Sequence, residues 1–261
     1  ERHAGDAKLL AGGQSLVATL NLRLSSPGIL IDITGLPGLS GVKVENGVLR
    51  IGALTTHREI EMSPEIAEHL PLLAQAAPHI AHAAIRNVGT FGGSIAMADP
   101  AAEYPACCLA LDAQFVIAGR KGERRVAARA FFRGMYETAL KSDELLVAGE
   151  FRLAPGYASA FLELSRRHGD YAIVGIAAHG KFEGGCFADL RLAYLGAGAA
   201  PVLALRAAAA VEGKACSAAN VAAAQAALAK DMDPPADLYS SSATKLHLAR
   251  VLTGRALAAL A

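Results

Sequence analysis

The sequence predicts an α+β fold, or an α/β fold of several subdomains, and three observations support this prediction. Strand-like and helix-like segments follow one another without regular alternation. Hydrophobic residues make up 53% of the 261-residue chain and charged residues 19%, so the chain can bury a core and is too apolar to be disordered. The tripeptide Ala154-Pro155-Gly156 is the best candidate boundary between two domains, at 1–154 and 157–261.

The N-terminal part consists of short apolar runs that end in turns. Lys8–Ala11 is typical of a strand that leads into Gly12-Gly13, and Ser63-Pro64 supplies a cap and a first-turn proline for a helix. The expected strands are 8–11, 29–33, 48–54, 115–118, 125–127 and 145–153. The expected helices are 15–24, 65–77 and 101–111, with a loop over 34–41 that separates subdomains of about 1–34 and 35–154.

Beyond the boundary, a small sheet precedes three helices. The expected strands are 159–165, 173–182 and 190–195, and the expected helices are about 201–212, 217–230 and 241–260. Polar residues such as Arg206 and Gln225 interrupt the alanine-rich runs. Since no charge-free stretch of about 20 apolar residues occurs, we predict no membrane span.

Charge and cysteine usage exclude several classes of protein. Lys plus Arg number 25 and Asp plus Glu 24, so the balance gives no electrostatic reason to expect nucleic acid or an anionic membrane as a partner. The cysteines, at 107, 108, 186 and 216, form no Cys-x-x-Cys pair. This spacing argues against a four-thiolate metal site or a disulfide framework, and favours a reducing, cytoplasmic compartment.

Two glycine turns are the strongest candidate binding elements. Ala11-Gly12-Gly13-Gln14-Ser15 and Thr90-Phe91-Gly92-Gly93-Ser94 each pair two glycines with a polar residue after an apolar segment. Adjacent glycines allow successive amides to point into one concavity, which binds phosphate oxygens, and two such nests suit a diphosphate. Each turn alone is equally well explained as a connector. Neither matches a Walker loop or a G-x-G-x-x-G fingerprint.

The two glycine turns stand in one order along the chain with Ile51-Gly52-Ala53, Arg86–Ser94 and Gly169-Asp170-Tyr171-Ala172. In order and spacing, these segments resemble the FAD-binding medium subunit of the molybdenum hydroxylases. The family includes the medium subunit of carbon monoxide dehydrogenase and the flavin domain of xanthine dehydrogenase. The resemblance implies a two-subdomain FAD-binding fold of the PCMH type, followed by a C-terminal domain with a small antiparallel sheet and a helical bundle. The family usually begins about one helix earlier, so we expect a trimmed N-terminus.

The resemblance also implies the residues that hold FAD. Both turns would hold its diphosphate through main-chain amides, the segment before the second turn would lie along the cofactor, and an acidic residue would bond a cofactor hydroxyl. The leucine pair and the tyrosine would lie beside the flavin ring. The implied residues are Ala11, Gly12, Gly13, Gln14, Ser15, Leu16, Ile80, Ala81, Thr90, Gly92, Gly93, Ser94, Glu103, Leu145, Leu146 and Tyr171. Two positions depart from the family pattern: Gln14 stands where histidine is common, and Glu103 where aspartate is common.

The function implied is electron transfer in a dimer of heterotrimers. A large subunit would carry the molybdenum cofactor, and a small subunit with two [2Fe–2S] clusters would pass electrons to FAD here and on to an external acceptor. Carbon monoxide, an aldehyde and an N-heterocycle all remain open as substrates. A stand-alone flavin oxidoreductase and a non-redox nucleotide-binding scaffold remain alternatives. A metal site at His69, His79 and His82 is disfavoured by their spacing.

Overall fold

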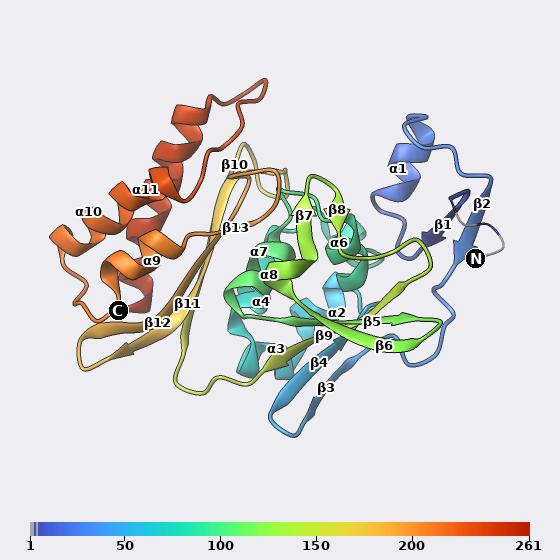
Figure 1. The fold of residues 1–261 in the computed structure, drawn as a ribbon, viewed down its shortest axis with the longest axis horizontal. Coiled ribbons are helices and arrows are strands. Elements are labelled where there is room, and N and C mark those ends of the chain that lie inside the picture. Colours follow the sequence, from blue (N-terminus) through green and yellow to red (C-terminus); the bar gives the residue numbers. More distant parts are fainter. Residues whose placement is uncertain (1–2, 4) are drawn as a thin grey trace.

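The N-terminal region is a small unit at one end of the molecule (Figure 1, blue). The computed structural model describes residues 3 and 5–261. The region comprises β1 (Ala7–Leu10), α1 (Leu16–Asn21) and β2 (Ile29–Asp32). The two strands pair in parallel, with Leu10 opposite Asp32. The first glycine turn therefore leaves the end of β1 and leads directly into α1.

The middle region is built on a five-stranded antiparallel sheet in the order β3-β4-β9-β5-β6. Its strands are β3 (Val42–Glu45), β4 (Val48–Gly52), β5 (Gln114–Gly119), β6 (Gly122–Ala127) and β9 (Leu145–Arg152), with a separate small hairpin of β7 (Phe132–Gly134) and β8 (Glu137–Thr138). The helices are α2 (His57–Met62), α3 (Pro64–His69), α4 (Pro71–Ala76), η1 (Ala77–His79), α5 (Ala83–Arg86), α6 (Phe91–Met97), α7 (Glu103–Ala110) and α8 (Ala128–Phe131).

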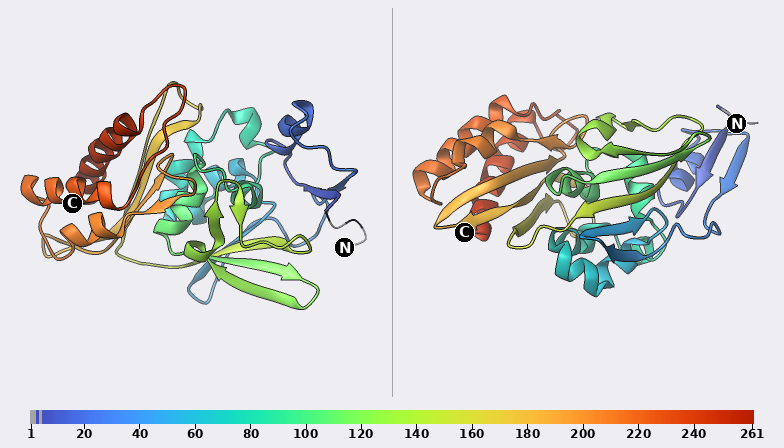
Figure 2. Two further views of the ribbon diagram at one scale, coloured as in Figure 1. Left: turned by 45° about the horizontal axis from the view of Figure 1, so that its top comes forward. Right: turned by 60° about the horizontal axis from the view of Figure 1, so that its bottom comes forward.

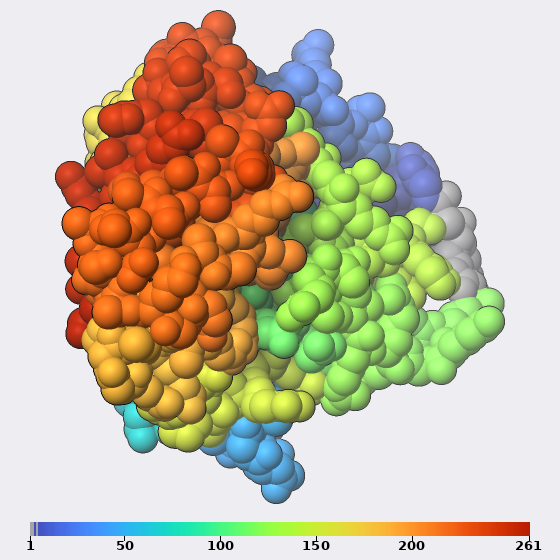
Figure 3. All heavy atoms as spheres, turned by 60° about the vertical axis from the view of Figure 1, so that its left-hand side comes forward, coloured from blue at the N-terminus to red at the C-terminus, as the bar shows by residue number. Residues whose placement is uncertain are grey.

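The C-terminal region is a four-stranded antiparallel sheet covered by helices (Figure 2). Its elements are β10 (Ala158–Ser165), β11 (Ala172–Glu183), β12 (Cys186–Leu195), β13 (Val202–Leu203), α9 (Leu205–Val211), α10 (Ala218–Ala227), η2 (Leu228–Lys230) and α11 (Ser242–Leu260). The helices form the outer face of the molecule, coloured orange and red in Figure 3. Among the described helices, none has the length and apolarity that crossing a membrane requires.

The C-terminal sheet is buried on both faces. Side chains alternate along its strands: Ala177 and Leu195 join the core of the middle region, whereas Ile176 and Tyr194 join the core beneath the helices. Polar contacts reinforce the inner face, since the amide of Phe161 donates to Gln75 Oε1 at 2.9 Å. This sheet therefore joins the middle region and the helical layer into one packed body.

The structure corrects several expected elements. A helix not anticipated from the sequence, α2, begins with a capping box between Thr56 and Glu59. The helix expected at 65–77 is split into α3 and α4, because Pro71 lacks the amide that would continue it. The second glycine turn is the first turn of α6, in which Thr90 accepts a hydrogen bond from the amide of Gly93. The extra strand β3 (Val42–Glu45) begins directly after the expected loop at 34–41 and pairs with β4.

Two buried tyrosines give a matched test of hydrogen bonding in the core. The hydroxyl of Tyr104 is buried and has no partner among the described residues, whereas that of Tyr194 lies 2.8 Å from Thr253 Oγ1. Since losing a satisfied hydrogen bond costs about 1 kcal/mol, we expect Tyr194→Phe to lower the free energy of unfolding by that amount. Tyr104→Phe removes only an unpaired group and should leave stability unchanged or increase it. Thermal unfolding of the two variants checks this, and equal losses would contradict it.

Candidate functional site

A pocket of about 710 Å³ opens where the three regions meet. Its walls come from the first glycine turn and α1, from the elements between β4 and α7, from the start of β9, and from the β10–β11 loop. All of the residues named from the sequence line it: Ala11, Gly12, Gly13, Gln14, Ser15, Leu16, Ile80, Ala81, Thr90, Gly92, Gly93, Ser94, Glu103, Leu145, Leu146 and Tyr171. The fold thus brings together segments that lie more than 150 residues apart in sequence.

The first turn presents a row of free backbone donors. Gly13 has φ +70°, a left-handed conformation that favours glycine. None of the backbone amides from Gly12 to Leu16 donates a hydrogen bond within the described chain. Five consecutive unpaired amides beside a helix start match the donor set that phosphate oxygens require. The Gln14 side chain bonds the carbonyl of Gly12 at 3.0 Å and so supports the turn from within.

The two turns are in direct backbone contact. A Cβ on Gly12 would lie 2.1 Å from the carbonyl oxygen of Val88 and 2.8 Å from the Cα of Gly89, so only glycine fits there. This contact places the first turn against the residues that lead into α6. Residues of both turns line the same pocket.

The second turn differs from the first because its amides are already used. The amides of Phe91 and Gly92 donate to the carbonyls of Thr55 and Ala53, both at 2.8 Å. A Cβ on Gly92 would lie 2.5 Å from the Cβ of Ala53, so this glycine allows α6 to pack against the end of β4. Gly93 is exposed toward the pocket, and a Cβ there would approach only the Thr90 hydroxyl. This turn therefore offers a ligand the start of a helix and hydroxyl groups, whereas the first turn offers free amides.

Two carboxyl groups, that of Glu103 in the pocket wall and that of Glu163 outside it, interact through their charges. Glu103, the first residue of α7, is 9% exposed, and burial raises its pKa to about 8, with the charges of Glu163 and Asp99 adding to the shift. Glu163, on β10, has its pKa raised to about 7 by burial, and its Oε2 has no partner in the described structure. At neutral pH the pair therefore retains protons, and Glu103 can donate as well as accept a hydrogen bond.

His57 is a pocket residue that the sequence reasoning missed. It is 6% exposed, its Nδ1 is buried without a partner among the described residues, and burial lowers its pKa to about 4, with the nearby Arg86 charge adding to the shift. A Cβ on Gly89 would meet its Cδ2–Nε2 edge at 2.9 Å, so the neutral ring supports the contact between the turns. The signal available in the sequence was the Thr56–Glu59 capping box, which predicts a helix start at this point.

The mouth of the pocket is formed partly by the C-terminal region. Tyr171 is 73% exposed at the end of the β10–β11 loop. Gly169 in the same loop lies against Ala81, whose carbonyl would be 2.7 Å from a Cβ there. Among the described residues, no group of three or more His, Cys, Asp or Glu side chains is arranged to hold a metal ion.

Comparison with known proteins places this geometry in one family. Residues 1–150 match the FAD binding domain in molybdopterin dehydrogenase, and residues 159–260 match the CO dehydrogenase flavoprotein C-terminal domain. The chain is 38% identical to the 6-hydroxypseudooxynicotine dehydrogenase complex subunit alpha of Paenarthrobacter nicotinovorans over 97% of this chain and 86% of that protein. It is 34% identical to the glyceraldehyde dehydrogenase medium chain of Sulfolobus acidocaldarius, over 95% and 88%.

Solved structures agree with these matches. A chain of carbon monoxide dehydrogenase from Hydrogenophaga pseudoflava superposes with a TM-score of 0.97 at 38% identity, over 99% of this chain and 91% of that one. A chain of quinoline 2-oxidoreductase from Pseudomonas putida gives 0.93 at 35% identity, over 98% and 89%. The fold and pocket define a flavoprotein of the FAD-binding type. The chain belongs to the medium-subunit family of the molybdenum hydroxylases, as the motifs predicted.

The carboxyl pair predicts a stability that depends on pH. Because the folded-state pKa values of Glu103 and Glu163, about 8 and 7, lie above the ordinary 4.5, the folded chain keeps protons that the unfolded chain has lost. Stability should therefore fall as pH rises from 7 to 8, a window in which the buried His57 and His179 are neutral in the folded chain and mostly neutral in the unfolded chain. Thermal unfolding of the FAD-free chain should show this slope. Glu103→Gln should flatten it and Glu68→Gln, at an exposed site, should not; equal slopes in wild type and Glu103→Gln would contradict the assignment.

Proposed function

We propose that this chain is the FAD-binding electron-transfer subunit of a heterotrimeric molybdenum hydroxylase, an oxidoreductase. The observation that carries the proposal is the contact of Gly12 with Val88 and Gly89, which brings a row of free amides to the wall of a 710 Å³ pocket. Such a row beside a helix start is suited to a dinucleotide diphosphate. The family to which the chain belongs is defined by FAD binding.

The residues present fit FAD along the whole pocket. The amides from Gly12 to Leu16 and the hydroxyl of Ser94 would hold the diphosphate. Ile80 and Ala81 would lie along the cofactor, and Glu103 would bond one of its hydroxyl groups. Leu145, Leu146 and Tyr171 would supply the apolar surroundings of the flavin ring. The remaining members of the predicted set, Ala11, Thr90, Gly92 and Gly93, would shape the two turns around it.

When bound, FAD would supply the redox chemistry, because it can accept electrons passed on by the [2Fe–2S] clusters of a partner and give them to an external acceptor. The residues of this chain bind the cofactor, orient it and exclude water from it. The buried apolar side chain of Leu146 lowers the local polarity, and the protonated Glu103 adds no negative charge to the pocket wall. None of the chain's side chains has to transfer a proton to a substrate in this scheme.

The proposal extends to the partners. A large subunit would carry the molybdenum cofactor and the substrate site, a small subunit would carry two [2Fe–2S] clusters, and two such heterotrimers would associate. Relatives are described as medium chains or subunits of dehydrogenase complexes, which supports a multi-subunit assembly. The described cysteines are all unpaired thiols, which supports a reducing, cytoplasmic compartment. The division of the chain near 154–156 stays part of the proposal.

Gly93 offers a direct test of the diphosphate site. Gly93→Asp puts a carboxylate toward the pocket, and we expect the dissociation constant for FAD to rise at least 100-fold because like charges repel in a partly buried site. The asparagine of Gly93→Asn has nearly the same shape as aspartate without the charge, so this variant should raise the dissociation constant no more than tenfold. Titration of flavin fluorescence measures both. Equal effects of the two variants would indicate steric crowding alone. If neither variant changes the dissociation constant, the assignment of the diphosphate to this turn is wrong.

The subunit role is tested by co-purification. Affinity-tagged chain expressed with its natural neighbours should bring down a molybdenum-containing subunit and an iron–sulfur subunit, detected by metal analysis. The chain alone should bind FAD, shown by visible absorbance. A chain that binds FAD but recovers no metal-containing partner would support the stand-alone oxidoreductase. A chain that gains no flavin absorbance would overturn both.

A further inference from the structure

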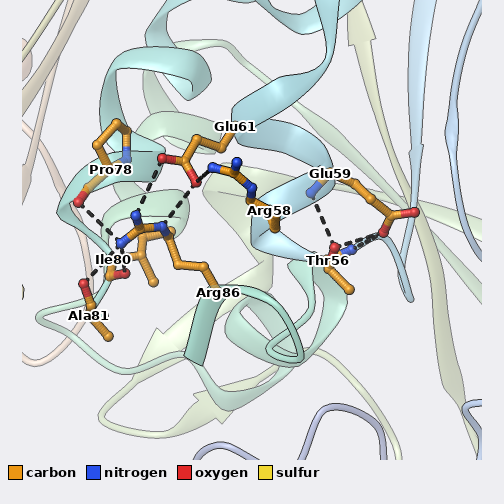
Figure 4. Close-up of polar contacts among 8 residues, drawn as sticks. All are labelled: Thr56, Arg58, Glu59, Glu61, Pro78, Ile80, Ala81 and Arg86. Atoms are coloured by element: carbon orange, nitrogen blue, oxygen red, sulfur yellow. Dashed lines mark hydrogen bonds and ion pairs between the residues drawn. The ribbon is translucent and has the colours of Figure 1, made fainter. Parts of the chain in front are cut away.

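Arg86 is the most extensively bonded side chain beside the pocket, although it does not line it. The side chain is 9% exposed and projects from the end of α5. Its Nε and Nη2 donate to the two carboxylate oxygens of Glu61, at 3.1 and 3.3 Å. Its Nη1 is directed at three backbone carbonyls, those of Pro78, Ile80 and Ala81, at 3.5, 3.1 and 3.0 Å (Figure 4).

The arrangement argues against Arg86 as a ligand of the diphosphate. Its fork faces Glu61 and the chain at 78–81, and its charge is neutralised by a two-point ion pair. Glu61 is correspondingly held as a carboxylate: burial alone would raise its pKa, but hydrogen bonds from Arg86 and Arg58 bring the pKa below its ordinary value. The donors of Arg86 are therefore committed within the protein.

The three carbonyls belong to the segment 78–81, here called the strap, whose last two residues form part of the pocket wall. Ile80 and Ala81 both line the pocket. Ala81 has φ +44°, a left-handed conformation that is unfavourable for alanine and persists only where the surroundings impose it. The guanidinium supplies such a constraint, because it draws the carbonyls of successive residues toward a single nitrogen.

The strap in turn seats the loop that carries Tyr171. A Cβ on Gly169 would lie 2.7 Å from the carbonyl oxygen of Ala81, so the β10–β11 loop rests directly on the residue that Arg86 holds. The rings of His79 and His168 stack beside this contact, with centroids 6.0 Å apart. A continuous path of contacts thus runs from Glu61 through Arg86 and the strap to the C-terminal region.

We propose that Arg86 is a positioning residue: it sets the strap at Ile80–Ala81 so that the Tyr171 loop closes the mouth of the pocket. It acts through backbone carbonyls and does not touch the cofactor. This role concerns the same pocket as the proposed function. Its expected effect on FAD affinity rests on that proposed function. The seating of the loop itself is a property of the chain without FAD.

Two arginines that share Glu61 provide a matched comparison. Arg58 donates to the same carboxylate at 3.1 Å, but its side chain is 47% exposed, and Glu61 is the one side chain it bonds in the described structure. The variants are therefore Arg86→Met, Arg86→Lys and the control Arg58→Met. The readouts are amide hydrogen exchange of residues 166–171 in the FAD-free chain, FAD affinity by fluorescence titration, and thermal unfolding.

Arg86→Met should speed exchange over 166–171 at least tenfold and weaken FAD binding by about the same factor, with Arg58→Met unchanged in both. Arg86→Lys keeps the charge opposite Glu61 but lacks the planar fork. Its thermal stability should therefore lie closer to that of the wild type than its exchange rate over 166–171 does. If Arg86→Met does not fold, Arg86→Lys carries the exchange test. The proposal is wrong if loop exchange stays at the wild-type rate, or if Arg58→Met changes it equally. Failure of the wild type to bind FAD would overturn the proposed function and leave the exchange result valid.

Discussion

The site depends on a backbone contact that only glycine allows, that of Gly12 with Val88 and Gly89. The N-terminal region has few buried side chains of its own, and β1 and β2 expose Leu9, Leu30 and Ile31. Its position is therefore set where it touches the middle region. Because that contact is also the point at which the two turns meet, the same few atoms fix the relative placement of two regions and create the pocket between them.

The opposite wall depends on a sheet that packs against other elements on both of its faces. Alternate residues of β11 and β12 enter two different cores. A one-residue shift of either strand, or its separation from either layer, would therefore expose apolar surface. The β10–β11 loop is anchored at both ends by this sheet and rests on the strap held by Arg86. A loop at the mouth of the pocket is thereby carried by rigid elements on both sides.

Sequence reasoning located the pocket better than it located the helices. The paired glycines are local signals of close backbone approach, so the pattern and the family resemblance indicated residues at 11–16 and 90–94 that do line the pocket, while their binding of FAD stays a prediction. The break at Pro71 and the capping box at Thr56 are equally local signals, and they belong to helices that were not predicted correctly. The contact of Gly12 with Val88, the charge interaction of Glu103 with Glu163, and the ion pair of Arg86 with Glu61 join residues that no local pattern relates. They follow only from tertiary packing.

The vicinal thiols of Cys107 and Cys108 show a last consequence of this packing. Both side chains are completely buried in α7, and burial raises the pKa of each well above its ordinary value. Since the thiolate is the form that oxidants attack, these sulfurs stay protonated and inaccessible. A helix that begins at the pocket thus carries two thiols that stay unreactive toward oxidants, although they lie near the site through which electrons would pass.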